Sequence, residues 1–445
     1  MRVSKIIETL REIGVSPVKT LGQNFLHDRN LGRWIVEQAG VSPDDYVVEI
    51  GPGLGALTEH ILTAGARVLA IEKDARLVNF LREKFSTAKL EVLHVDALKF
   101  DPRVLYSWPE VKLLANLPYY ISSQILLRYL NYPSPICLYL LMLQKEMARR
   151  LSAEPGTRDY GALSLQVQLH YRVEYLRSVP AAVFIPRPEV DSALVLITPR
   201  DAEELPYCDY ELFRKLVRDG FAQRRKKLGK LLQSDVPHWQ EVVQALGLAP
   251  NVRAEELSLL QWIALTNQVA PVKPSKSHTE QEECFAVVDE SDRPVRVASR
   301  AEVHANNLLH RAVHVLIFNE KGEVYLQKRA RWKDRHALAW DSSAAGHVEA
   351  SEDYDRTAKR ELTEELGIDA PLQKVAKLPA SERTDFEFIS LYRGSYDGEL
   401  HPNRNEIEAG QFFPTSVVNN WIKARRDEFA PGFLECWDVL RQQAG

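Results

Sequence analysis

The sequence predicts a parallel, doubly wound α/β domain, followed by a second domain that begins with strands. Three observations support this prediction. Short β-rich runs alternate with helical patterns through the first 200 residues, strand patterns then disappear, and they restart after a polar, proline-containing segment. The length of 445 residues fits two or three domains at roughly 150 residues each.

Six runs rich in aliphatic residues define the expected strands of the first sheet. They are Tyr46–Ile50, Arg67–Glu72, Leu90–Val95, Val111–Asn116, Ile136–Leu143 and Ala193–Thr198. Helical stretches lie between most of them, so we expect these strands to run parallel. Asp209–Gln268 has apolar residues at three- and four-residue spacing and no strand pattern, which predicts a small helical domain.

The expected boundaries follow these changes of pattern. They give a first α/β domain, a helical domain, a linker and a second domain, at 1–200, 201–268, 269–282 and 283–445. The linker has two prolines and little to bury. In the second domain we expect strands and then a long helix, at Phe285–Asp289, Ala312–Asn319, Val324–Lys328 and Asp353–Leu366.

The bulk composition excludes several classes of protein. The formal net charge is −4, so contact with nucleic acid would need a local basic patch. The four cysteines form no CxxC pair, which favours a reduced, cytoplasmic protein. No run approaches ~18 uncharged apolar residues, so we expect neither a signal peptide nor a transmembrane helix. We also expect a monomer.

A glycine-rich loop, Glu49–Gly55, follows the first expected strand and opens a helix. Gly51 and Gly53 let a ligand approach the backbone at the carboxyl edge of the sheet. Glu72 ends the next strand, where a carboxylate can accept both hydroxyl hydrogens of a ribose. Asp96 ends the third, where it can meet an adenine amino group. The loop alone is also compatible with a dinucleotide fold or a tight turn, so the two acids strengthen the prediction of a cofactor.

The tetrapeptide Asn116-Leu117-Pro118-Tyr119, at the end of the fourth expected strand, predicts chemistry on an exocyclic base amine. Such an amine is a poor nucleophile because its lone pair is delocalised into the ring. A side-chain amide oxygen and a backbone carbonyl can accept its two hydrogens and free that lone pair. Proline removes a competing donor, and the aromatic residue can stack on a base turned out of its helix.

These motifs resemble the KsgA (RsmA) family of small-subunit ribosomal RNA adenine dimethyltransferases, from about Lys19 to Leu265. The similar segments are Gly22–Leu26, Glu49–Gly55, Asn116–Ser122, Gln144–Glu146, Phe184–Ser192 and Gln223–Lys226. The resemblance implies a Rossmann-like fold that uses S-adenosylmethionine (SAM) and transfers two methyl groups to each of two adjacent adenosines near the 3′ end of 16S RNA. It implies cofactor contacts at Asn24, Leu26, Gly51, Gly53, Glu72, Asp96 and Asn116, with Tyr119 and Phe184 packed around the flipped adenine.

Two related activities remain as alternatives, namely methylation of a large-subunit RNA adenine and a mitochondrial-type role in transcription. Leu117 and the run Gln144–Glu146 favour the small-subunit activity. A dehydrogenase would give no reason for Asn116–Tyr119. The basic run Arg224-Arg225-Lys226-Lys227 is expected to contact RNA phosphates, although such runs are commonly solvated helix faces.

Three glutamates, Glu361, Glu364 and Glu365, lie three and four residues apart and therefore share one face of an expected helix. Like charges this close would repel one another unless a divalent cation lay among them, and carboxylate oxygens suit Mg²⁺ or Mn²⁺. Arg360 can tie down Glu352 and hold the preceding loop against the helix. The alternative is a solvated acidic helix.

The segment matches the pattern GX5EX7REUXEEXGU, the Nudix box, at every fixed position from Gly346 to Ile368. The C-terminal domain therefore resembles a Nudix domain. This implies an α+β fold with a mixed sheet between helices, and hydrolysis of a diphosphate linked to another group. Metal ions would neutralise the bridging oxygens and activate a water.

Flanking residues resemble the Nudix branch that contains isopentenyl-diphosphate isomerase. In that branch a second metal is held by histidines and glutamates, which implies such a role for His304, His310 and His347. The alternative is that His304 and His310 are ordinary surface residues. Asp341–Ser343 fills the stretch of the isomerase's catalytic cysteine, and the intact Nudix box favours hydrolysis over isomerisation.

For the whole chain, two active enzymes compete with a methyltransferase that carries a binding module and with a fusion lacking functional coupling. Both sets of motifs are complete, which favours two active enzymes.

Overall fold

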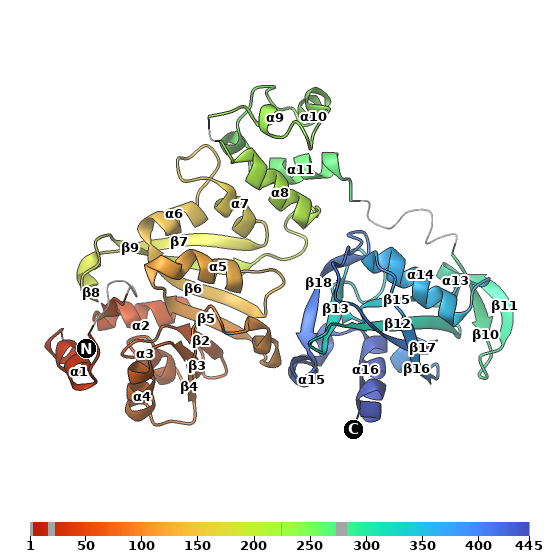
Figure 1. Ribbon diagram of the computed structural model, residues 1–445, viewed down its shortest axis with the longest axis horizontal. Coiled ribbons are helices and arrows are strands. Elements are labelled where there is room, and N and C mark those ends of the chain that lie inside the picture. Colours follow the sequence, from red (N-terminus) through yellow and green to blue (C-terminus); the bar gives the residue numbers. More distant parts are fainter. Residues whose placement is uncertain (1–2, 17–22, 224, 273–282, 445) are drawn as a thin grey trace. The chain divides into compact units, whose positions relative to one another are not determined.

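The computed structural model describes residues 3–16, 23–223, 225–272 and 283–444, and the chain divides into two compact units, 1–271 and 272–445 (Figure 1). Most of the predicted linker, residues 273–282, lies outside the described residues, and Val269 still belongs to the last helix of the first unit. No helix in the described ranges has the length and apolar content needed to cross a membrane.

A seven-stranded sheet in the order β4-β3-β2-β5-β6-β9-β7 forms the centre of the first unit. Its strands are β2 (Tyr46–Ile50), β3 (Arg67–Glu72), β4 (Leu90–His94), β5 (Val111–Asn116), β6 (Ile136–Gln144), β7 (Tyr171–Val179) and β9 (Ser192–Pro199). The five strands from β4 to β6 run parallel, as predicted.

The prediction of a wholly parallel sheet is wrong at the other edge. Strand β9 runs antiparallel to both β6 and β7, and β7 was not predicted at all. Residues 180–191 between β7 and β9 contain no α-helix, so the chain turns back along the same edge instead of crossing over. Charged residues such as Arg172 and Glu174 interrupt the apolar pattern of β7 because it is an edge strand.

Helices lie on both sides of this sheet (Figure 1). They are α1 (Val3–Glu12), α2 (Arg29–Gln38), α3 (Thr58–Thr63), α4 (Ala75–Lys84), α5 (Ser122–Tyr129), α6 (Lys145–Leu151) and α7 (Ala162–Gln168). A separate two-stranded ribbon pairs β1 (Phe25–Leu26) with β8 (Phe184–Ile185), so that Leu26 lies opposite Phe184. Two residues predicted for the first site are therefore neighbours.

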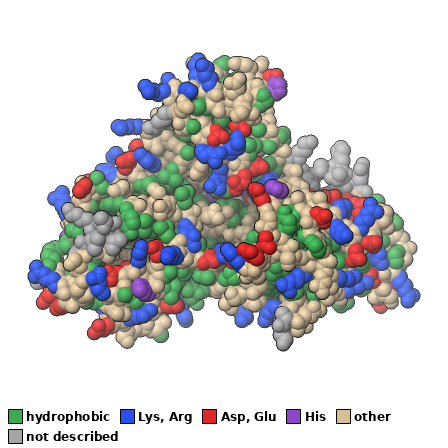
Figure 2. All heavy atoms as spheres, in the orientation of Figure 1, with side chains coloured by type: hydrophobic (Ala, Val, Ile, Leu, Met, Phe, Trp, Pro, Cys, Tyr) green, Lys and Arg blue, Asp and Glu red, His purple; other side chains and the backbone are tan. Residues whose placement is uncertain are grey.

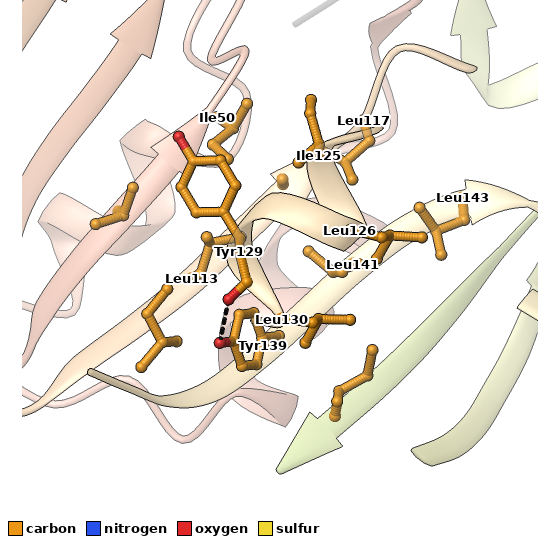
Figure 3. Close-up of a cluster of buried hydrophobic side chains, with 14 of the residues drawn as sticks. Ile50, Leu113, Leu117, Ile125, Leu126, Tyr129, Leu130, Tyr139, Leu141 and Leu143 are labelled. Atoms are coloured by element: carbon orange, nitrogen blue, oxygen red, sulfur yellow. Dashed lines mark hydrogen bonds between the residues drawn. The ribbon is translucent and has the colours of Figure 1, made fainter. Parts of the chain in front are cut away.

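The core beneath the site consists of aliphatic side chains from the sheet and α5 (Figure 3). Leu113 and Leu141 belong to β5 and β6, and Leu126 belongs to α5. The Tyr139 hydroxyl donates to the backbone carbonyl oxygen of Tyr129 across 2.7 Å (Figure 3). Burying one such aliphatic side chain contributes about 1.5–3 kcal/mol to the stability of the fold. This core therefore holds the ends of the strands in place, and polar residues lie at those ends.

The segment predicted to be helical does contain helices, and it is part of the first unit. It contains α8 (Tyr210–Gly220), α9 (Leu228–Leu231), α10 (Trp239–Ala245) and α11 (Leu259–Val269). Phe213, Leu216 and Trp262 are fully buried, in a core that these helices share with Tyr160 and with Leu165 of α7. Figure 2 shows Lys and Arg side chains on the outer end of this domain, at the top of the view.

The second unit contains a seven-stranded mixed sheet, as predicted. Its strands are β12 (His310–Phe318), β13 (Glu323–Arg329), β14 (Trp340–Asp341), β15 (Ala344–His347), β16 (Leu372–Leu378), β17 (Glu387–Ser395) and β18 (Ile407–Pro414). Beside it lies the hairpin of β10 (Cys284–Val288) and β11 (Pro294–Ser299). The helices are α13 (Arg300–Ala305), α14 (Tyr354–Leu366), α15 (Thr415–Ala424) and α16 (Pro431–Ala444).

Helices α14 and α16 lie on opposite faces of the second sheet. Val313 and Val315 of β12 belong to the same buried cluster as Leu362 of α14. His314, between them, lies on the other face, where it approaches Gly432 of α16. Helix α14 is thus fixed by its apolar side on the central strand β12, while Glu361 and Glu365 face strand β15.

Candidate active sites

A cavity of about 480 Å³ opens at the carboxyl ends of β2, β3 and β5. Every residue predicted to contact the cofactor lines it: Asn24, Leu26, Gly51, Gly53, Glu72, Asp96 and Asn116. These positions are far apart in the sequence, and they meet because parallel strands end at one edge of the sheet.

The glycine loop adopts a backbone conformation, with positive φ angles, that few residues other than glycine tolerate. Gly51 and Gly53 have φ angles of +68° and +57°, and a Cβ on Gly53 would lie 3.1 Å from the ring of Phe25. The following helix begins later than predicted, at Thr58, and has only six residues. The loop's own backbone, rather than a helix end, therefore borders the cavity.

Two acids reach the cavity from β3 and from the loop after β4. Glu72 is 8% exposed, and its Oε1 accepts from the backbone amides of Lys73 and Asp74 at 2.8 and 2.9 Å. Oδ2 of Asp96 lies 2.7 Å from Nζ of Lys73, and this hydrogen bond lowers the Asp96 pKa. An adenine amino group that donates to Asp96 would therefore share that carboxylate with Lys73.

Glu49, the first residue of the loop motif, is a buried acid that also lines the cavity. Burial raises the pKa of its carboxyl group to about 7, although the Thr58 hydroxyl donates to Oε2 at 2.5 Å. Sequence analysis gave this residue no role of its own, because a glutamate before a glycine loop carries no signal of how deeply it is buried.

Asn116 occupies the end of β5, where its side-chain nitrogen donates to the backbone carbonyl oxygen of Asn24 at 3.0 Å. The side-chain oxygen is the end of the amide that can accept hydrogens from an amine. Pro118 lines the same cavity, whereas Leu117 is buried in the core. The Tyr119 and Ser192 hydroxyls lie 2.5 Å apart.

The predicted base-stacking residues lie on two different segments. Tyr119 is half-buried after β5, and Phe184 is 2% exposed on β8. Neither borders the cofactor cavity, although Tyr120 and Ile121 do. Tyr120 is 50% exposed, so solvent reaches the part of the cavity wall that it forms.

The basic run lies in the connection between α8 and α9 rather than on a helix face. Arg225, Lys226 and Lys227 are exposed, and Lys227 is the residue before the first turn of α9. Arg224, the other member of the predicted set, lies outside the described residues. The three described side chains project positive charge from a short turn.

In the second unit, α14 presents its glutamates to a cavity of about 750 Å³. The predicted metal ligands, Glu361, Glu364 and Glu365, all line it. Glu365 is 6% exposed, and its Oε2 accepts from Nε2 of Gln327 at 2.9 Å and from the Ala345 amide at 3.1 Å. Burial raises the pKa of both Glu361 and Glu365.

The loop before α14 is held as predicted. Nε of Arg360 lies 3.1 Å from Oε2 of Glu352, and its NH1 group donates to Glu364 at 2.8 Å. Beside the Glu361 side chain, position 346 has room only for glycine, because a Cβ there would lie 2.1 Å from Cδ of Glu361. The Glu361 carboxyl group therefore packs directly on the Gly346 backbone.

The three histidines noted in the sequence converge on one point. One ligand nitrogen from each of His304, His310 and His347 lies within 4.8 Å of the others. Glu387 joins them, with its Oε1 3.1 Å from Nε2 of His347 and 3.5 Å from Nε2 of His310. His310 is 1% exposed and is not a surface residue.

The outer partners of His304 and His310 set the roles of their ring nitrogens, whereas Nδ1 of His347 accepts from the guanidinium of Arg300 at 3.2 Å. Nδ1 of His310 lies 2.8 Å from the carbonyl oxygen of Leu308, which can only accept, so Nδ1 carries the hydrogen. Nδ1 of His304 likewise faces Asp334 at 3.3 Å. In neutral rings both Nε2 atoms then point lone pairs inward, and such outer partners are typical of metal-binding histidines.

Glu387 was not predicted from the sequence, and its position explains why. In the parallel pairing of β12 with β17, His310 lies directly opposite Glu387, whereas His347 lies opposite Ala312 in the antiparallel pairing with β15. Only the register of two strands far apart in the sequence brings this acid to the histidines, and no local motif reports that register.

The fold and the two cavities define a Rossmann-like methyltransferase joined to a hydrolase-type domain with an acidic helix. The family comparison makes this specific: the chain belongs to the ribosomal RNA adenine dimethylase family, whose model matches residues 17–270. The NUDIX domain model matches residues 308–433. The match is to the NUDIX domain in general, so the isomerase-like branch remains a prediction.

Curated relatives support the family assignment. Ribosomal RNA small subunit methyltransferase A of Geobacillus thermodenitrificans is 39% identical over 278 residues, covering 60% of this chain and 95% of the relative. The protein of the same name from Halothermothrix orenii is 41% identical over 272 residues, covering 58% and 90%. The crystal structure of the 23S rRNA methyltransferase ErmE is 26% identical with a TM-score of 0.48, covering 55% of this chain and 99% of that one.

Proposed function

We propose that the first unit transfers two methyl groups from SAM to N6 of each of two adjacent adenosines near the 3′ end of 16S ribosomal RNA. The observation that carries this proposal is Asn116, which lies at the cofactor cavity with its amide nitrogen bound to Asn24. The relatives named small subunit methyltransferase A favour this RNA over a large-subunit adenine. The protein would act in ribosome biogenesis, in the cytoplasm and as a monomer.

In this proposal each group of residues has one task. SAM supplies the electrophilic methyl group when it is bound. Glu72 would hold its ribose and Asp96 its adenine, and the backbone of Gly51 and Gly53 would leave room for it. The Asn116 side-chain oxygen and a backbone carbonyl of the same tetrapeptide accept the hydrogens of the target amine.

RNA contacts would involve two further surfaces. Tyr119 and Phe184 pack around the flipped adenine, which loses its stacking partners when it leaves the RNA. Arg225, Lys226 and Lys227 contact phosphates, and Arg224 is proposed for the same role from the sequence alone.

The test is methyl transfer from labelled SAM to small ribosomal subunits that lack the modification. Wild-type protein should label the RNA. Asn116→Ala should lower the rate by about 100-fold or more, because the amine loses its hydrogen-bond acceptor. Asn30→Ala on α2, an exposed asparagine outside the cavity, is the matched control and should transfer at the wild-type rate. If wild-type protein does not label the RNA of these subunits, the assignment is wrong.

We propose that the second unit hydrolyses a diphosphate-containing small molecule with Mg²⁺ or Mn²⁺ held by Glu361, Glu364 and Glu365. Ten carboxylates and five Lys or Arg side chains line the described part of the cavity, which leaves it strongly acidic. Divalent cations would neutralise that excess and draw in a diphosphate. The ions would also activate the attacking water.

We propose a second divalent ion at His304, His310, His347 and Glu387. The inward lone pairs of two histidines beside a buried carboxylate support this site, since imidazole nitrogens suit transition metals such as Zn²⁺, and carboxylate oxygens also suit Mn²⁺. Its test is metal content after dialysis: His310→Ala should lose one ion per chain relative to the wild type. Equal metal content in the two proteins would contradict the site.

Activity of the second unit is tested by phosphate release over a panel of diphosphates with Mg²⁺ or Mn²⁺. Glu365→Gln should reduce turnover by about 100-fold or more. Lys423→Ala, an exposed change on α15, should not. If wild-type protein binds diphosphates without cleaving them, the domain is a binding module, and if it isomerises one, the isomerase alternative holds.

A further inference from the structure

The hydroxyl group of Tyr119 has a buried partner that the methyl-transfer proposal does not use. Ser192 is fully buried as the first residue of β9, and its hydroxyl lies 2.5 Å from that of Tyr119. Strand β9 lies between β6 and β7, where Ser192 pairs with Gln144 and Val179. The Tyr119 ring is thus attached to a central strand rather than to a loop.

The neighbouring residue, Asp191, fixes the other predicted base-stacking segment. Its Oδ1 accepts from the backbone amide of Ala181 at 3.0 Å, and its carbonyl oxygen accepts from the Lys145 amide at 3.0 Å. Ala181 begins the 3₁₀ turn that leads into Phe184 on β8. The pair Asp191-Ser192 therefore connects the segments of Tyr119 and Phe184.

Hydrogen bonds also hold the backbone of the Asn116–Tyr119 turn. Only the orientation of the Tyr119 ring remains to be fixed. Ser122 donates its hydroxyl to the Tyr119 carbonyl oxygen at 3.0 Å, and the Leu117 amide donates to the Met142 carbonyl oxygen at 3.1 Å. Neither contact restrains rotation of the Tyr119 side chain. The hydroxyl bond to Ser192 does, since it joins the far end of the ring to the sheet.

We infer that Ser192 is a positioning residue for methyl transfer: its hydroxyl holds the Tyr119 ring in the orientation that receives the flipped adenine. This inference rests on the proposed methylation of a base amine. It goes beyond that proposal because Ser192 touches no substrate and acts only through Tyr119. Misplacing a group by about 1 Å can cost as much as 100-fold in rate, so removing this hydrogen bond should be visible in catalysis.

The experiment compares Ser192→Ala, Tyr119→Phe and the double variant in the full chain. The readouts are the single-turnover rate on undermethylated small subunits, SAM affinity by calorimetry and thermal unfolding. Each single variant should be about 10-fold slower, and the double variant should be within twofold of the slower single variant, because both changes remove one hydrogen bond. SAM affinity should stay within about twofold, since neither residue borders the cofactor cavity.

Ser178→Ala is the matched control, because Ser178 shares a hydrogen bond of 2.8 Å with the Tyr175 hydroxyl on β7 of the same sheet. It should transfer at the wild-type rate. Effects that multiply to about 100-fold in the double variant would overturn the inference, as would a wild-type rate in Ser192→Ala. An inactive wild-type protein would instead refute the proposed methylation, so the two failures are distinguishable.

Discussion

The side-chain nitrogen of Asn116 donates to the backbone carbonyl oxygen of Asn24 across 3.0 Å, joining the end of β5 to the segment before β1. The two residues are 92 positions apart, yet both border the cofactor cavity. With its nitrogen engaged, the Asn116 amide has a defined orientation, and its oxygen is the group available to an amine. In the proposed reaction, this hydrogen bond connects the cofactor cavity with the group that accepts hydrogens from the target amine.

Gly55→Ala should destabilise the first unit through a steric clash. Gly55 has a φ of +79°, and a Cβ there would lie 2.4 Å from Cε2 of Phe85. Gly40 has a φ of +54° with nothing within 4 Å of its Cβ position, so Gly40→Ala isolates the backbone cost. We expect about 1 kcal/mol for Gly40→Ala and about 2–4 kcal/mol for Gly55→Ala in urea unfolding. If Gly40→Ala and Gly55→Ala lost the same free energy of unfolding, the protein would have relieved the clash with Phe85.

Gly346→Ala should abolish hydrolysis without unfolding the second unit. The added Cβ would meet Cδ of Glu361 at 2.1 Å, and the glutamate can relieve this overlap by swinging its carboxyl group away. We expect turnover to fall by about 100-fold or more, as in Glu361→Gln, while the melting temperature changes by only a few degrees. Normal turnover in Gly346→Ala would argue against Glu361 as a metal ligand.

Glu49→Gln should change stability in a pH-dependent way. Burial raises the pKa of Glu49 in the folded protein to about 7, so the protonated form favours folding. That stabilisation is present below about pH 4.5 and is lost as the pH rises through about 7. Glutamine resembles the protonated carboxyl group, so the variant should match the wild type at pH 5 and exceed it by about 2–3 kcal/mol at pH 8.5. Urea unfolding at both pH values measures this, and a difference independent of pH would contradict the buried, protonated carboxyl.

Removing Lys226 and Lys227 together should weaken RNA binding in a salt-dependent way. Both are exposed in the turn before α9. A lysine that binds a phosphate contributes about one to the slope of log affinity against log salt, so replacing it with alanine should make that slope shallower by the same amount. Titrations of the double alanine variant with small subunits at several salt concentrations measure the slope. An unchanged slope would mean that this turn is solvated rather than bound to RNA.

Much of the first site could be predicted because its residues end parallel strands. Glu72 and Asn116 end their strands and Asp96 closely follows one, and the carboxyl ends of parallel strands share an edge whatever their exact length. The acidic helix could be predicted equally well, because the spacing of Glu361 and Glu365 alone places them on one face of a helix. In both cases local spacing determines the geometry.

What could not be predicted depends on pairing between distant segments. Glu387 joins the histidines through the register of β17 against β12, and Ser192 reaches Tyr119 because β9 enters the sheet antiparallel. The expectation of a parallel strand failed there because the connection after β7 has no crossover helix. Such arrangements are set by tertiary packing and leave no periodic signal.

The most direct test of the account is to locate the methyl groups in the RNA. Undermethylated small subunits would be incubated with SAM and the full chain, and the 16S RNA would be digested and analysed by mass spectrometry. We predict two adjacent N6,N6-dimethyladenosines near the 3′ end, absent when Asn116→Ala replaces the wild type. Finding no dimethyladenosine in the 16S RNA, or finding it only at other positions, would contradict the account.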